Sequence, residues 1–142
     1  MAHSAAYLAD TNVYVTAAND DTIRREFARF IERHGPLLVS SVVLAEVVIG
    51  IANAASREGA VHAVSAGTVV VAPSADDWTR AGMAVAQLGG EAVTKSRSFW
   101  NDAILAAQCA RLGVTLLTHN AKDFQRLGRH LGVHAVAPFP ER

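Results

Sequence analysis

Four acidic residues stand where chain topology could bring their carboxylates together: Asp10, Glu46, Asp102 and Asp123. Each lies just after a short apolar segment, or in a helix beside one. In open α/β sheets, ligands bind beyond the carboxyl ends of the strands. Gathered carboxylates repel one another and are costly to desolvate, and a divalent cation is the simplest compensation. Oxygen ligands without Cys or a close His pair favour Mg²⁺ or Mn²⁺ over zinc. Such a site can activate water for attack on a phosphodiester.

Each acid also has an ordinary structural explanation. Asp10 could cap a helix, Asp102 could complement a helix dipole, and Asp123 could form a solvated surface pair with Lys122. Glu46 differs, because it lies in an otherwise apolar stretch. A helix that is apolar all round is normally buried, and a buried carboxylate without a partner is costly. A functional role is therefore favoured for Glu46.

The elements that must position these acids follow from hydrophobic periodicity and from Gly, Pro and capping residues. Alternating strands and helices imply right-handed crossovers, and so a mostly parallel five-stranded sheet with helices on both faces. We expect strands at 5–9, 37–39, 68–72, 114–118 and 133–137. We expect helices at 20–34, 42–56, 57–66, 75–88, 98–111 and 120–127, a helix or loop at 11–19, and a loop at 91–97.

Composition narrows the class of protein. The chain has 142 residues and a mass of 15.0 kDa, which fits one domain over 1–142. Thirteen basic and thirteen acidic residues cancel, so net charge does not decide for or against nucleic acid. A single cysteine, Cys109, excludes a disulfide framework and a multi-thiolate zinc site, and suits the reducing cytoplasm. No segment predicts a membrane span or a secretory signal.

Four blocks of the sequence carry a family resemblance. They are YLADTNVYV (7–15), SSVVLAEVVIG (40–50), NDAILAAQCARLGVTLLTHNAKDF (101–124) and GVHAVAPF (132–139). In this order they resemble the successive blocks of a PIN domain, and most of all the VapC-type toxins of bacterial type II toxin–antitoxin modules. The third block is the most specific, and the resemblance spans almost the whole chain.

The resemblance implies functional residues at matching positions. The aspartate of the first strand matches Asp10, and Thr11 and Asn12 match its usual neighbours. The helical glutamate matches Glu46, and the third acid matches Asp102. These residues are implied to be both catalytic and metal-binding.

The fourth acid leaves two positions open. Family members carry it either directly after the Thr-x pair, here Asn120, or three residues later, here Asp123. We expect Asp123 to be the fourth acid, with Asn120 as a polar helper and Thr118 as a hydrogen-bonding neighbour. Asn101, before the third acid, replaces a residue that is usually hydrophobic.

The resemblance also implies a fold and an activity. The fold is a three-layer sandwich with strand order 3-2-1-4-5. The activity is that of a Mg²⁺- or Mn²⁺-dependent endoribonuclease acting on structured RNA such as tRNA or rRNA. A homodimer and a cognate antitoxin are implied, the antitoxin commonly inserting a peptide, often with a basic side chain, into the acidic site. We expect Asp10 and Asp102 to hold the principal ion, and Glu46 and Asp123 to bind through water or to hold a second ion.

Phosphate contacts dominate affinity for RNA, so cations must flank such a site. Lys95 and Arg97 precede the helix that carries Asp102 and are candidate RNA contacts. A second set, at four-residue spacing, is better explained as a solvated helix face. It consists of Arg25, Arg29 and Arg33.

Two other classes of protein compete with the ribonuclease. A haloacid-dehalogenase-type phosphatase also begins with a strand ending in Asp, but it requires a second acid two residues later, where this chain has Asn12. The other class is a PIN-like binding or assembly module without catalysis. All four acids are present, so the sequence shows no sign that catalysis has been lost. A cleavage assay would distinguish the ribonuclease from the binding module.

Overall fold

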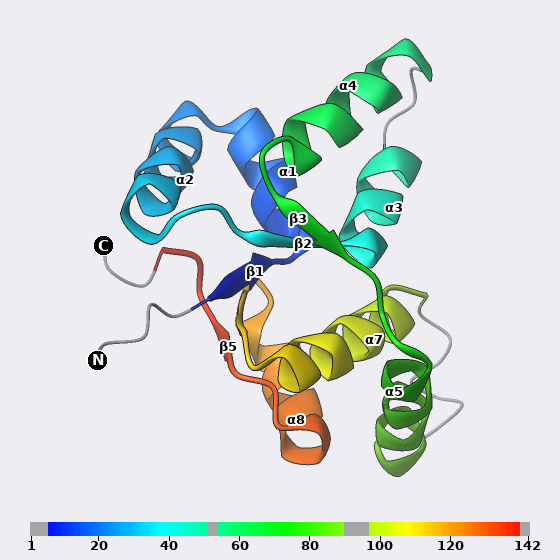
Figure 1. Cartoon of the computed structure of the whole chain (residues 1–142). Coiled ribbons are helices and arrows are strands. Elements are labelled where there is room, and N and C mark those ends of the chain that lie inside the picture. Colours follow the sequence, from blue (N-terminus) through cyan, green and yellow to red (C-terminus); the bar gives the residue numbers. More distant parts are fainter. Residues whose placement is uncertain (1–5, 51–53, 90–96, 140–142) are drawn as a thin grey trace.

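Five short strands form one sheet in the computed structural model, which describes residues 6–50, 54–89 and 97–139. The strand order is β3-β2-β1-β4-β5 and all four pairings are parallel (Figure 1). The predicted order 3-2-1-4-5 is therefore confirmed. The strands are β1 (Tyr7–Ala9), β2 (Leu38–Ser40), β3 (Val69–Val71), β4 (Thr115–Leu117) and β5 (Ala135–Val136).

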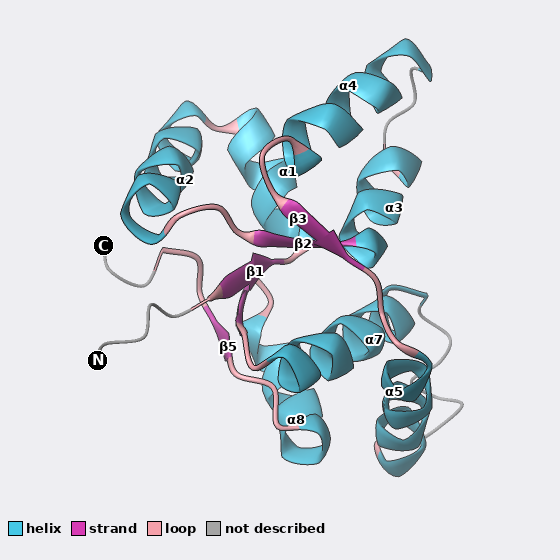
Figure 2. Cartoon of the chain, viewed as in Figure 1, coloured by secondary structure: helices cyan, strands magenta, loops and turns pink. Residues whose placement is uncertain are grey.

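Helices cover both faces of this sheet, as Figure 2 shows. On one side α1 packs against α2 and α3, and α3 packs against α4. On the other side α5, α7 and α8 pack against one another. The three layers confirm the predicted sandwich. The helices are α1 (Thr11–Asn19), α2 (Asp21–His34), α3 (Ser41–Ile49), α4 (Ala54–Ser65), α5 (Ala75–Gln87), α7 (Arg97–Leu112) and α8 (Ala121–Leu131).

Side chains at the helix N-termini account for where several helices begin. The Asp20 carboxylate accepts from two backbone N–H groups of α2, and the Ser40 hydroxyl accepts from the N–H of Val42 in α3. Ser74 and Asp77 form a reciprocal capping box at the start of α5. These bonds satisfy donors that a helix N-terminus otherwise leaves without partners.

The core is dominated by the helix that follows Asp102. Residues 103–107 of α7 are all at most 2% exposed. Ala81 and Ala84 of α5 belong to the same core cluster, and α5 packs against α7. None of the helices in the described ranges has the length and hydropathy that a membrane crossing needs.

Helix α3 differs from its prediction in extent and in burial. It ends at Ile49 instead of near residue 56, and residues 54–56 belong to α4. Only Val43 is buried, while Ile49 is 64% exposed. The expectation of burial all round was wrong: the helix ends after nine residues, and α1 and α4 pack against it without covering its whole surface.

Helix α8 is longer than predicted, ending at Leu131 instead of near Leu127. Gly128 suggested a break, but it serves packing: a Cβ at this position would lie 3.1 Å from the carbonyl oxygen of Val133. The helix ends instead at Gly132, whose φ of +72° favours glycine. The predicted loop at 91–97 lies outside the described residues except for Arg97, which begins α7.

One ion pair, between the partly exposed Arg111 and the buried Asp77, joins α7 to α5. The fully buried carboxylate of Asp77 receives the Nε–H of Arg111 at 3.0 Å and also the backbone N–H of Ser74. A buried carboxylate that loses its cation keeps the cost of desolvation without the attraction. This pair therefore joins the start of α5 to the end of α7.

We expect Arg111→Leu to lower the free energy of unfolding by about 1–2 kcal/mol, because the buried Asp77 charge loses its cation while solvent at the partly exposed arginine limits what the pair contributes. Urea unfolding followed by circular dichroism measures the change. Arg25→Leu, which removes an exposed arginine from α2, is the matched control. Equal loss in the two variants would contradict a stabilising role for the pair.

Candidate active site

The parallel register places Asp10 beside Thr118. Ala9 of β1 pairs with Leu117 of β4, so the residue that follows each strand emerges at the same edge of the sheet. The Thr118 hydroxyl donates to Oδ2 of Asp10 at 2.9 Å, and the backbone N–H of Thr11 donates to Oδ1 at 2.8 Å. Asp10 therefore does cap α1, as its ordinary explanation requires. It is also held by a residue 108 positions away.

A polar network extends from this pair across the ends of β1 and β4. The Asn12 amide donates to Asp10 and to Thr118, and its oxygen accepts the backbone N–H of His119. The backbone N–H of Asn120 donates to the Thr118 hydroxyl oxygen at 3.0 Å. All the supporting polar residues predicted at this edge thus take part in one network, which fixes the orientation of the Asp10 carboxylate.

Asp123 enters the same edge from the first turn of α8. The side-chain amide of Asn120 donates to Oδ2 of Asp123 at 2.9 Å. The two positions left open for the fourth acid are therefore bonded to each other, with the amide orienting the carboxylate.

Glu46 enters from α3. Its Oε1 accepts a hydrogen bond of 3.0 Å from the Thr11 hydroxyl, so the residue after Asp10 also orients the helical glutamate. The side chain is half-buried.

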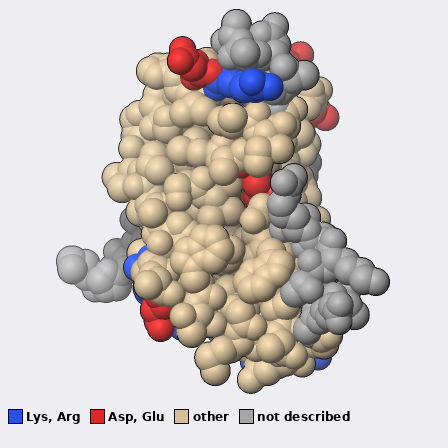
Figure 3. Space-filling view, turned by 90° about the vertical axis from the view of Figure 1, so that its right-hand side faces the viewer, with Lys and Arg blue, Asp and Glu red and all other residues tan. Residues whose placement is uncertain are grey.

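Asp102 links all four acids electrostatically. It is 8% exposed, and burial first, followed by the charges of Asp10, Glu46 and Asp123, raises its pKa to about 8. Burial also raises the pKa of Asp10, although its hydrogen bonds and the nearby His119 oppose that shift. The charges of three carboxylates from separate elements thus act on Asp102 at this edge of the sheet. Figure 3 shows acidic atoms at the centre of one face, with Lys and Arg atoms only at the margins of its described part.

The four carboxylates are the kind of ligand that a hard divalent cation prefers. All four groups offer carboxylate oxygens, and three of them disfavour the charge on the fourth, which is the repulsion that a bound Mg²⁺ or Mn²⁺ would offset. In the part of the chain that the structure describes, no three His, Cys, Asp or Glu side chains stand close enough together to hold a metal ion. The carboxylates therefore interact electrostatically, but their side chains are not arranged as a set of metal ligands.

Sequence reasoning missed a buried amide that supports the site from below. Gln108 of α7 is fully buried; its Oε1 accepts from Ser40 at 2.6 Å and its Nε2 donates to the carbonyl of Val71 at 3.1 Å. Ser40 caps the helix that carries Glu46, so this amide ties that helix to the one that carries Asp102. The signal in the sequence was that Gln108 is the one amide within the apolar stretch 103–110.

The predicted RNA contacts Lys95 and Arg97 are not placed by the structure. Lys95 lies outside the described residues, and Arg97 begins α7 with its side chain outside them. Both remain predictions.

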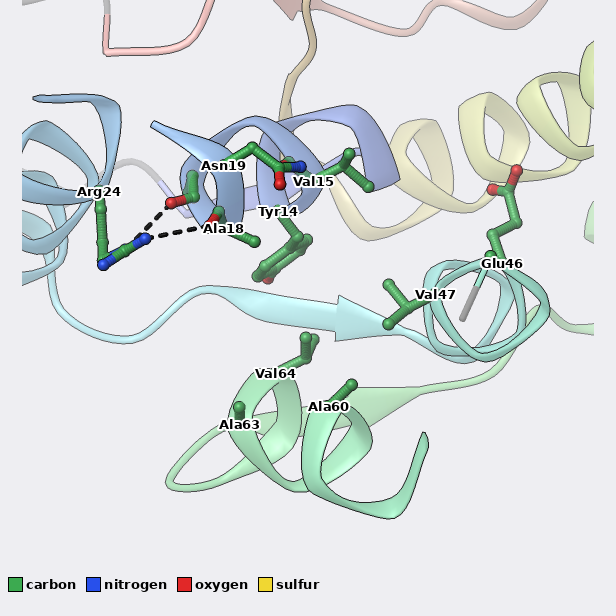
Figure 4. A pocket seen from close by; sticks show the side chains of 12 residues that line it. Tyr14, Val15, Ala18, Asn19, Arg24, Glu46, Val47, Ala60, Ala63 and Val64 are labelled. Carbon is green, nitrogen blue, oxygen red and sulfur yellow. Dashed lines mark hydrogen bonds between the residues drawn. The ribbon is translucent and has the colours of Figure 1, made fainter. Parts of the chain in front are cut away.

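A cavity of about 610 Å³ adjoins the carboxylates between α1, α3 and α4. Its lining is mostly apolar and includes Tyr14, Val47 and Val64, with Glu46 at one end and Arg24 at the other (Figure 4). The guanidinium of Arg24 donates to the backbone carbonyls that end α1. The Glu46 carboxylate points away from the apolar wall of α4 and towards α7 (Figure 4).

Comparisons with known proteins bear on the family and on the fold. A PIN domain family model matches residues 7–130. Chains in three solved structures share the fold. VapBC-1 from nontypeable Haemophilus influenzae matches with a TM-score of 0.73 and 21% identity, over 92% of this chain and 96% of that chain. VapBC2 from Rickettsia felis bound to a promoter DNA fragment matches with a TM-score of 0.68 and 19% identity, over 92% and 97% of the two chains, and DNA-bound VapBC from Salmonella typhimurium with a TM-score of 0.65 and 20% identity, over 94% and 98%. At these identities the likeness is one of fold. No match was found among curated proteins.

The raised pKa of Asp102 predicts a pH-dependent stability in the absence of metal. Because the folded-state pKa of about 8 exceeds the ordinary 3.8, this carboxyl favours the folded state most below about pH 4, and the contribution is lost as the pH rises towards 8. At pH 8 we expect the free energy of unfolding of the Asp102→Asn variant to be higher than that of the unmodified chain by on the order of 1–3 kcal/mol.

Urea unfolding in EDTA at pH 4 and pH 8 measures this effect. Asp20→Asn, at an exposed helix cap, is the control for an acid-to-amide change outside the site. A gain for Asp102→Asn that is the same at both pH values would contradict the proposed repulsion.

Proposed function

Because the chain belongs to the PIN domain family, we propose that it is a Mg²⁺- or Mn²⁺-dependent endoribonuclease, the toxin of a type II toxin–antitoxin pair. The observation that carries the proposal is the placement of four acids at one edge of the sheet, where Asp10 is bonded to Thr118, Glu46 to Thr11 and Asp123 to Asn120. Burial and the three other carboxylates raise the pKa of Asp102 there, which supports it. Structured RNA, such as tRNA or rRNA, is the proposed substrate and the cytoplasm its place of action.

The carboxylates would divide the work of holding metal. Asp10 and Asp102 are the more buried and would bind the ion directly, while the half-buried Glu46 and Asp123 would bind through water or hold a second ion. A bound divalent ion would supply Lewis-acid stabilisation of the phosphate charge and a lowered pKa for attacking water.

The hydrogen-bonded residues would keep these oxygens in place during the reaction. Thr118 and Asn12 donate to Oδ2 of Asp10, and Thr11 donates to Glu46. Carboxylates oriented in advance need not reorganise as charge develops, which is how a fixed polar site lowers a barrier. Since Thr118 also accepts from the Asn120 N–H, the end of β4 is oriented with the same network.

The cavity beside Glu46 supports the proposal of an antitoxin partner. The VapBC structures are complexes, and an extended antitoxin segment could lay apolar side chains between α1, α3 and α4. A basic side chain at its end would then meet the carboxylates, whose excess negative charge attracts a cation. A homodimer is part of the same proposal.

We expect Asp10→Asn and Asp102→Asn each to lower metal-dependent RNA cleavage by at least about 100-fold, because each removes a charged metal ligand. Cleavage of a labelled RNA stem–loop in Mg²⁺ or Mn²⁺, with EDTA as the blank, measures this. Asp20→Asn is the matched control, because Asn caps a helix about as well as Asp and the residue lies outside the site.

Circular dichroism must show that each variant keeps the fold. Equal cleavage by the unmodified chain and both site variants would overturn the proposal. Absence of cleavage by the unmodified chain in either metal, with retained binding of a partner protein, would instead support a PIN-like module without catalysis.

A further inference from the structure

Helix α8 carries a basic face beside the carboxylates. Lys122, Arg126 and Arg129 are all exposed, and their spacing of four and three residues places them on one side of the helix. The opposite side is buried, through Phe124, Leu127 and Leu131. Helix α8 is therefore amphipathic with a cationic outer face, a pattern that the sequence reading did not single out.

One electrostatic interaction and one side-chain contact place this face next to the site. Asp123, adjacent to Lys122, belongs to the carboxylate group that acts on Asp102. The guanidinium of Arg126 lies 5.9 Å from the ring centroid of Phe99, which is one helical turn before Asp102 on α7. The basic face thus begins at the carboxylates and continues away from them along α8.

The cations of this face are available to a ligand. Within the described part of the chain, Lys122, Arg126 and Arg129 make no ion pair or hydrogen bond, and α8 carries one acid, Asp123. The basic residues of α2 differ, because acids alternate with them: Arg24 pairs with Asp21 at 3.1 Å. Free cations in a row are suited to a row of phosphates.

We propose that Lys122, Arg126 and Arg129 form the surface along which the RNA backbone lies as it enters the acidic site. This inference rests on the proposed ribonuclease function and names its substrate-binding face. A carboxylate site repels phosphates, so it needs cations close by that the carboxylates do not neutralise. The stacking of Arg126 on Phe99 holds one of these cations at the edge of the site with its N–H donors free to bind phosphate oxygens.

The test compares two double variants that remove the same charge. One is Arg126→Gln with Arg129→Gln on α8; the control is Arg25→Gln with Arg29→Gln, two exposed arginines of α2. Both are made in an Asp102→Asn background in EDTA, so that the RNA stays intact. Fluorescence anisotropy of a labelled RNA stem–loop gives the affinity at several salt concentrations.

We expect the α8 variant to bind RNA about tenfold more weakly, and the slope of log affinity against log salt to become shallower by roughly 1.5, as loss of two phosphate contacts requires. The α2 control should stay within about twofold of its parent, since its charges lie away from the phosphates. Similar effects in both doubles, or no RNA binding by the parent at low salt, would overturn the proposal.

Two further outcomes separate this inference from the proposed function. If the unmodified chain cleaves no RNA but the α8 variant loses RNA affinity as expected, the result supports RNA binding by the basic face and contradicts the proposed nuclease function. If the α8 variant binds RNA normally but loses affinity for poly-glutamate, the face serves an acidic peptide and the RNA surface is overturned.

Discussion

Repulsion among four carboxylates is the constraint around which the rest of this structure is arranged. In a parallel sheet the residues that follow the strands lie at the same edge, and here Asp10 follows β1 and Thr118 follows β4. Burial and neighbouring charge raise the pKa of Asp102 to about 8, so the fold keeps an arrangement that opposes its own stability. Such a cost persists in natural proteins mainly at functional sites, where a ligand offsets it.

The hydrogen bonds around the acids serve to hold them in place despite that repulsion. Thr118 bonds to Asp10 and accepts from Asn12 and Asn120, so a single hydroxyl joins β4, α1 and the start of α8. Below the site, Gln108 bonds to Ser40 and to Val71, joining α7 to β2 and β3. Because these groups are buried or partly buried, each missing bond would leave a costly unsatisfied polar atom. The network therefore gives rigidity to a site whose charges would otherwise separate.

Charge is distributed so that attraction and repulsion of phosphates lie side by side. The chain is neutral in total, yet the acids converge at the sheet edge and three cations line the neighbouring outer face of α8. One helix contributes to both, through Asp123 and through the exposed basic residues that follow. Because the two kinds of charge are separated on the surface, the net charge of the chain does not reveal either of them.

The sequence by itself predicted the alternation of strands and helices, because hydrophobic periodicity and capping residues are local features, and the family motifs implied the strand order that the structure confirms. The same motifs implied the four candidate acids, Asp10, Glu46, Asp102 and Asp123, which remain a prediction. Tertiary structure decided what depended on distant contacts: the end of α3 and its partial exposure, the packing of Gly128 against Val133, and the partners of Gln108. It also decided that Arg126 lies over Phe99, at the edge of the carboxylates. A pattern of residues shows which side chains share one helix face, but only the packing of that helix against others sets what the face adjoins.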